Sequence, residues 1–147
     1  MHGGNDQVGF EVSYNARTRI LCLRMWGIWD EDIAIKYRDA VAQAIRALPR
    51  EPASFVLADL SRYPTQKPQV QKYHAELMKL AVAHNMTRAV NLVSATLTSM
   101  QIRRLSQESG LGEFSFFQDE AKAIEWLLSD AAADEDAVAR LQPKRTR

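Results

Sequence analysis

The order of apolar and polar residues predicts two β-strands near the start of the chain. Apolar and polar side chains alternate over residues 10–14 and again over residues 19–25, which is the period of a strand buried on one face. The four residues Asn15 to Thr18 between them suit a tight turn. The two runs are therefore predicted to form an antiparallel hairpin, with Gly27 at a bend after the second strand.

Four helices are predicted after this hairpin from start signals and apolar spacing. Asp30 is a suitable N-cap, and apolar side chains follow it at helical spacing until Pro49. A second helix begins near Gln69, and a third follows residues 96–98. The last begins at Asp119, again an N-cap residue.

Three further strands and two helix ends complete the pattern. The strands are the buried runs 54–60, 87–95 and 113–117. Asn85 and Gly110 are placed to end the second and third helices with a left-handed backbone.

Strands that alternate with helices predict an α/β fold with right-handed crossovers. We expect a single domain over residues 8–129, with a mixed, mostly parallel sheet of about five strands and helices packed on it. The first strand is the antiparallel exception. Residues 1–7 and 130–147 have little to bury and are predicted to be flexible termini.

Composition narrows the class of protein. The chain has 147 residues, 46% of them hydrophobic and 25% charged, which is ordinary for a globular domain. A formal net charge of +1 argues against a nucleic-acid binder. One cysteine, Cys22, fits a reducing compartment, and no apolar run is long enough to span a bilayer. Residues 1–7 lack the regions of a signal peptide, so a cytoplasmic protein is expected.

The best candidate site lies where the central strand ends. Asp59 and Ser61 close a buried strand, and a polar turn runs on to Pro68. Ligands and partners of open α/β sheets gather at the carboxyl ends of strands. The alternative is that both side chains only hydrogen-bond their own backbone, as such residues commonly do.

No catalytic or metal site is predicted. Asp59, Ser61 and His74 could be assembled into a nucleophilic set, but no Gly-x-Ser-x-Gly turn accompanies them. His74 is expected on the polar face of its helix, and His84 as a cation near the end of that helix. The three histidines and the one cysteine show no metal-ligand spacing, and no glycine loop for a phosphate is present.

Aromatic side chains suggest two surfaces. Trp26 and Trp29 flank the first crossover and Tyr63 and Tyr73 flank the polar turn, so the four could line a pocket; the alternative is that they cover the core. A second group comes from a strand that could lie at the sheet edge and from the last helix, where exposed apolar area would favour a homodimer. It comprises Phe114, Phe116, Phe117 and Trp126.

The order of elements and the residues at its joints resemble the STAS-like domains, the family of bacterial anti-sigma-factor antagonists, and more closely the SpoIIAA-like proteins. The resemblance covers residues 8–129. It is carried by Gly27 before the acid-capped first helix, the strand end 55–61, the strand start 87–90 and the closing segment 117–127. It implies a non-enzymatic module, without a cofactor, that binds a protein partner or a small ligand.

One departure from that family bears on regulation. Its phosphoregulated members carry a serine in an Asp-Ser-Ser-Gly turn at the start of the second helix, where a phosphate abolishes partner binding. Residues 62–68 of this chain contain neither that motif nor a glycine, and Thr65 is the nearest hydroxyl, with Arg62 and Lys67 beside it. The departure argues against a kinase-controlled switch. Resemblance to the fold also extends to lipid-carrying Sec14-type domains.

The sequence therefore predicts a non-catalytic STAS-like module that binds a protein partner or small ligand at the turn of residues 59–68. The alternative is a carrier or sensor of a small hydrophobic, lipid-like ligand. An enzyme has no support in the sequence. The candidate binding residues are Trp26, Trp29, Asp59, Ser61, Tyr63, Thr65 and Tyr73.

Overall fold

Six strands and four helices alternate along the chain in a computed structural model that describes residues 1–94 and 96–132. The strands are β1 (His2–Gly4), β2 (Gly9–Asn15), β3 (Ile20–Trp26), β4 (Phe55–Arg62), β5 (Arg88–Leu92) and β6 (Glu113–Phe117). The helices are α1 (Glu31–Ala47), α2 (Pro68–Ala83), α3 (Thr96–Glu108) and α4 (Glu120–Ala132).

The strands lie in the sheet in the order in which they occur along the chain, from β1 to β6. The pairs β1–β2 and β2–β3 are antiparallel, whereas β3, β4, β5 and β6 run parallel to one another. The expected class, a single α/β domain with a mixed, mostly parallel sheet, is confirmed, with one strand more than predicted.

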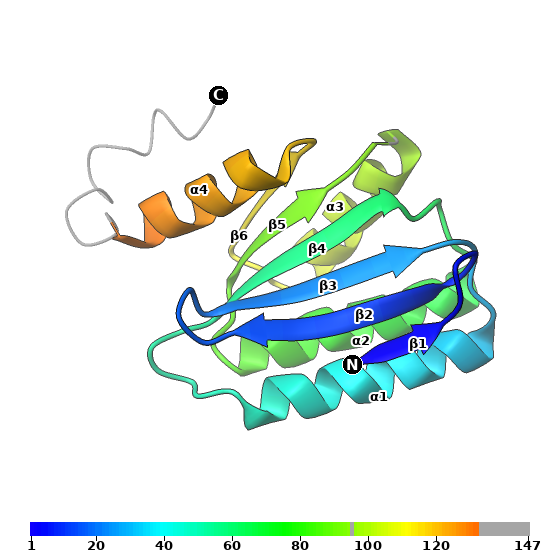
Figure 1. The fold of residues 1–147 in the computed structure, drawn as a ribbon, viewed down its shortest axis with the longest axis horizontal. Helices are drawn as coiled ribbons and strands as arrows, with labels where there is room; N and C mark the ends of the chain where they lie inside the picture. The colour runs from blue at the N-terminus through cyan, green and yellow to red at the C-terminus, as the bar shows by residue number, and fades with distance from the viewer. Residues whose placement is uncertain (95, 133–147) are drawn as a thin grey trace.

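Helices cover the two faces of the sheet unequally (Figure 1). On one face α1, α2 and α3 pack over a large core that includes Leu21, Leu23, Ala58 and Leu60. On the other face α4 lies over β4, β5 and β6, and a smaller core forms there around Leu57, Val90 and Leu127. Strand β4 is thus buried from both sides, as its continuous apolar sequence predicts.

The additional strand is β1, which lies within residues 1–7, the segment expected to be a flexible terminus. His2–Gly4 pairs antiparallel with β2, and the ammonium group of Met1 donates to the Val12 carbonyl at 2.7 Å. The glycines make this pairing feasible, because a Cβ atom at Gly3 would lie 2.6 Å from the Phe10 ring. At the other end α4 extends to Ala132, three residues into the segment expected to be flexible, and residues 133–147 of that segment lie outside the described part of the chain.

The predicted helix signals are confirmed in their geometry. The Asp30 carboxylate accepts a hydrogen bond from the Ile33 amide, and the Asp119 carboxylate accepts one from the Ala121 amide. Asn85 and Gly110 adopt left-handed backbones, with φ of 69° and 80°. These local rules depend on neighbouring residues alone, so they can be read from the sequence.

Both helical histidines differ from the prediction. His74 is buried in the core, where its Nε2 is hydrogen-bonded to the Tyr63 hydroxyl at 2.7 Å. His84 is also buried and is hydrogen-bonded to the Leu48 carbonyl at 2.6 Å. Each imidazole has a specific polar partner from a distant segment, and this offsets the cost of its burial.

We expect Gly27→Ala to destabilise the domain much more than Gly110→Ala. Both glycines have φ near +80°, so alanine is strained at either position, by about 1 to 2 kcal/mol. A Cβ atom at Gly110 meets nothing within 4 Å, but at Gly27 it collides with the Gln7 carbonyl oxygen and lies 2.8 Å from Val8 Cα. Urea unfolding of the two variants therefore separates the effect of backbone strain from that of the collision. The collision should lower the free energy of unfolding of Gly27→Ala by about 1 to 3 kcal/mol more. Equal losses would contradict this packing of the N-terminal segment.

Candidate functional site

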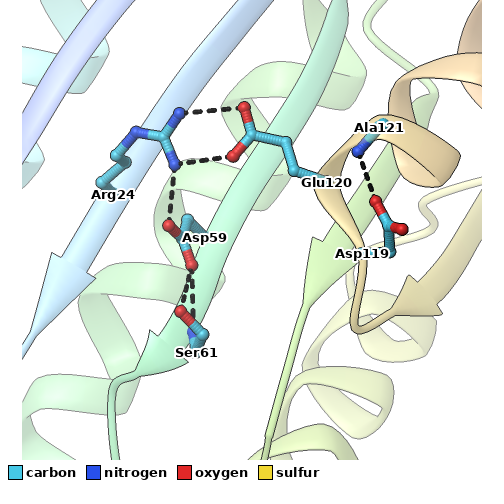
Figure 2. Close-up of polar contacts among 6 residues, drawn as sticks. All are labelled: Arg24, Asp59, Ser61, Asp119, Glu120 and Ala121. Carbon is cyan, nitrogen blue, oxygen red and sulfur yellow. Dashed lines mark hydrogen bonds and ion pairs between the residues drawn. The ribbon is translucent and has the colours of Figure 1, made fainter.

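A cluster of charged and hydroxyl side chains lies at the carboxyl end of β4, as Figure 2 shows. The Arg24 guanidinium donates from Nη1 to Asp59 Oδ2 at 2.7 Å and contacts both Glu120 oxygens at 3.1 Å. The Ser61 hydroxyl donates to Asp59 Oδ1 at 2.6 Å. We refer to Arg24, Asp59, Ser61 and Glu120 as the Arg24 cluster.

The parallel register of β3 and β4 builds this cluster. Arg24 lies directly beside Asp59 in the ladder. Because side chains alternate along a strand, both point to the face that α4 covers, opposite to Ala58 and Leu60. Glu120 enters from the first turn of α4, whose start is set by the Asp119 cap. Three separate elements thus converge on one guanidinium.

Hydrogen bonds keep Asp59 ionised. Burial raises the pKa of its carboxyl group, but hydrogen bonds from the Ser61 hydroxyl and amide and from Arg24 outweigh burial, and the pKa lies below its usual value. The bidentate contact with Glu120 raises the pKa of Arg24. The arrangement places two carboxylate side chains around one guanidinium cation.

Within the part of the chain that the structure describes, the Ser61 hydroxyl has no general base suited to activate it. Its recorded partner is the Asp59 carboxylate, which is a weak base because its pKa is lowered. His74, the third member of the set considered from the sequence, is instead bonded to Tyr63 inside the core. Asp59 also accepts from the Ser61 amide at 3.1 Å, so these two residues do bond locally, as the structural alternative predicts.

Residues 59–68, here called the carboxyl-edge turn, are held by a residue that the sequence did not single out. Gln66 is buried, and its side-chain oxygen accepts from the Trp29 amide at 2.8 Å. Its side-chain nitrogen donates to the carbonyls of Gly27 and Pro64. The side chains of Ser61, Arg62, Pro64, Thr65 and Lys67 are exposed around this fixed frame. No sequence signal marks Gln66, since its neighbours look like an ordinary polar turn.

The four candidate aromatic residues do not line a common pocket. Trp29 and Tyr63 are 1% and 2% exposed, and their rings pack against each other in the core. Trp26 is half-buried and donates from Nε1 to the Asn5 carbonyl. Tyr73 lies on α2, where its hydroxyl donates to Glu31 at 2.7 Å. Trp29 and Tyr63 therefore cover the core, which is the alternative stated for these aromatic residues.

A small apolar cavity does exist, at another place. It measures about 80 Å³ and lies between the sheet and the layer of α1, α2 and α3. Its wall is formed mainly by aliphatic side chains, with His74, Asn91 and Ser106 as polar members. Pockets for drug-sized ligands measure about 300 to 1,000 Å³, so this cavity is too small for a lipid.

An open depression borders the Arg24 cluster on the α4 face. It measures about 600 Å³ and lies over β2 and β3, beside α4. Its lining is largely polar and includes Ser13, Cys22, Arg24 and Glu120. Such a shallow, wide and polar surface differs from the apolar clefts that enclose small ligands.

Among the residues that the structure describes, no group of three or more His, Cys, Asp or Glu side chains could hold a metal ion. None of the helices in those residues is long and apolar enough to cross a membrane.

Comparison with known proteins supports the fold. No family model and no curated protein sequence matches the chain. An uncharacterised DUF3478-family protein with a SpoIIAA-like fold from Shewanella loihica is similar with a TM-score of 0.64 at 16% identity, over 86% of this chain and 98% of that one. An anti-sigma factor antagonist from Mycobacterium paratuberculosis is similar with a TM-score of 0.58 at 15% identity, over 87% and 99%. The expected SpoIIAA-like fold is therefore confirmed.

His74 is predicted to make stability depend on pH. Burial lowers the pKa of His74 to about 4, whereas the unfolded chain protonates near 6.5. The unfolded state therefore binds more protons between these values, and the free energy of unfolding falls as the pH falls, by about 2 kcal/mol from pH 7 to pH 5. Urea unfolding at several pH values between 7 and 5 measures this fall in the free energy of unfolding. His74→Phe should flatten the profile; an unchanged His74→Phe profile would refute this assignment.

Proposed function

We propose that the chain is a non-catalytic interaction module that binds a protein partner on the carboxyl-edge turn and the adjoining Arg24 cluster. The observation that carries the proposal is the fixed geometry of this turn. The side chain of buried Gln66 makes three hydrogen bonds, to the Pro64 carbonyl within the turn and to the backbones of Gly27 and Trp29 beside it, while five neighbouring side chains remain exposed. A surface ordered before binding loses little conformational entropy when a partner docks.

The size of the surface also favours a macromolecule. The carboxyl-edge turn continues through the Arg24 cluster into the open depression over β2 and β3. A protein partner covers about 800 Å² on each side in a typical stable interface, and a polar rim around fixed residues is common there. Similarity to an anti-sigma factor antagonist, a protein that acts on another protein, points in the same direction.

The same surface offers little support for a catalytic function. The serine donates its proton to a carboxylate of lowered pKa, and neither buried histidine is bonded to it. We therefore propose a binding role for Asp59, Ser61 and Thr65. Tyr63 and Trp29 would act indirectly, by packing under the turn, and Trp26 and Tyr73 would lie at its periphery.

Ser61→Arg and Thr65→Arg are predicted to abolish partner capture. Each places a long cation on the proposed contact surface, which should lower the amount of bound partner at least about tenfold. Affinity capture from the source organism, read by quantitative mass spectrometry, compares both variants with the wild type. Gln107→Arg is the matched control, because Gln107 is exposed on α3 and the substitution adds the same charge. Proteins retained by all four chains would contradict the proposed surface.

The alternative function, carriage of a lipid-like ligand, predicts a bound molecule in the purified protein. Because the apolar cavity measures about 80 Å³, we expect native mass spectrometry to show the mass of the unliganded chain. Tryptophan fluorescence should likewise not respond to oleate. A denaturing spectrum of the same sample controls for covalent modification. A retained adduct of lipid mass would favour the carrier instead.

A further inference from the structure

A further pocket lies at the end of the parallel strands opposite to the carboxyl-edge turn. The parallel strands β3, β4, β5 and β6 all begin at this amino edge (Figure 1). Residues at or just before these four starts surround a pocket of about 230 Å³. Its lining includes Arg19, Ser54, Phe55, Thr87, Arg88 and Glu113.

Arg19 occupies a backbone position that usually belongs to glycine or asparagine. It closes the β2–β3 turn with φ of 61°, and its amide donates to the Asn15 carbonyl at 2.7 Å. A left-handed backbone is strained for a residue that carries a side chain. Strain of this kind persists where the surrounding structure demands it, and functional sites are a common setting. Glycine would fit this backbone conformation without strain, but it would not supply the guanidinium group.

The Arg19 guanidinium is held in place over the pocket floor. Its Nε donates to the Ala53 carbonyl at 3.0 Å, and its central carbon lies 5.3 Å from the centre of the Phe55 ring. These contacts fix the plane of the group but use one of its five N–H donors. Within the described residues, no acceptor is recorded for its two Nη atoms. A fixed guanidinium fork matches the two oxygens of a carboxylate or phosphate.

Arg88 supplies a second guanidinium from the start of β5. It is 8% exposed, its Nη1 lies 3.1 Å from Glu113 Oε1, and its central carbon lies 4.6 Å from the centre of the Trp126 ring. The described lining thus contains two cations and one carboxylate. A guanidinium in a partly desolvated pocket attracts an anion more strongly than the same charge on an open surface.

We propose that this amino-edge pocket is a binding site for a small molecule that carries a carboxylate or phosphate group. The Arg19 fork would receive two oxygens of the anion, Arg88 would add charge, and Thr87, which also lines the pocket, could supply a further hydrogen bond. At about 230 Å³ the pocket is smaller than typical sites for drug-sized ligands, so the ligand is small. The site is separate from the carboxyl-edge turn and does not depend on the function proposed there.

The test is a titration of the full chain, followed by amide NMR spectra, with sodium phosphate, acetate or chloride at constant ionic strength. We expect saturable shifts for phosphate or acetate, confined to residues near positions 19, 53–55, 87–88 and 113. The anion that saturates at the lower concentration shows whether the ligand group is a phosphate or a carboxylate. Chloride, which cannot bind bidentately, should give weak shifts without saturation.

Matched variants separate this site from general charge effects. Arg19→Gly suits a φ of 61°, so the fold is retained, and it should raise the Kd for the preferred anion about tenfold or more. Arg17→Gln removes the same charge from an exposed position in the same turn and should leave the Kd unchanged. Glu113→Gln removes the competing carboxylate and should lower the Kd. Shifts that do not saturate, or a Kd that Arg19→Gly leaves unchanged, would overturn the proposal.

Discussion

The carboxylate of Asp59 imposes the constraint around which this domain is arranged. It lies on the α4 face of a strand that is otherwise buried from both sides, so its charge requires a partner where β4 leaves the core. Arg24 provides that partner from the adjacent strand at 2.7 Å, and Glu120 then balances the arginine from the start of α4. The ion cluster therefore ties β3, β4 and α4 together at one point. The same contacts hold Ser61 and the beginning of the carboxyl-edge turn in position.

Beneath the carboxyl-edge turn, aromatic side chains pack in the core. The rings of Trp29, Tyr37 and Tyr63 pack edge to face beside His74, and the Tyr63–His74 hydrogen bond satisfies two polar groups that would otherwise be costly to bury. The Gln66 side chain likewise satisfies backbone polar groups, in the turn at Pro64 and beside it at Gly27 and Trp29. The turn thus rests on a closed aromatic layer. Its outer side chains, including those of Ser61 and Thr65, are exposed above that layer.

Local signals in the sequence predicted most of the fold and little of the site. Asp30, Asn85, Gly110 and Asp119 act through residues within a few positions, and the alternation of residues 10–14 needs only the period of a strand. Arg24 and Glu120, by contrast, are 96 positions apart and meet only because of the sheet order. His74 and Gln66 were misjudged or missed for a related reason: a polar residue is buried when a distant partner satisfies it, and no local pattern reveals that partner.

The register of β3 with β4 is what connects the two ends of the sheet. Ile20 lies beside Phe55 at one end of this pair and Arg24 beside Asp59 at the other. The first pairing brings Arg19 over Phe55 in the amino-edge pocket, and the second builds the Arg24 cluster. A slip of one residue would turn both arginines away from their partners and expose Leu21 and Leu23, which are now buried. The hydrophobic core therefore specifies the placement of both polar sites, although neither site contributes an apolar residue to the larger core.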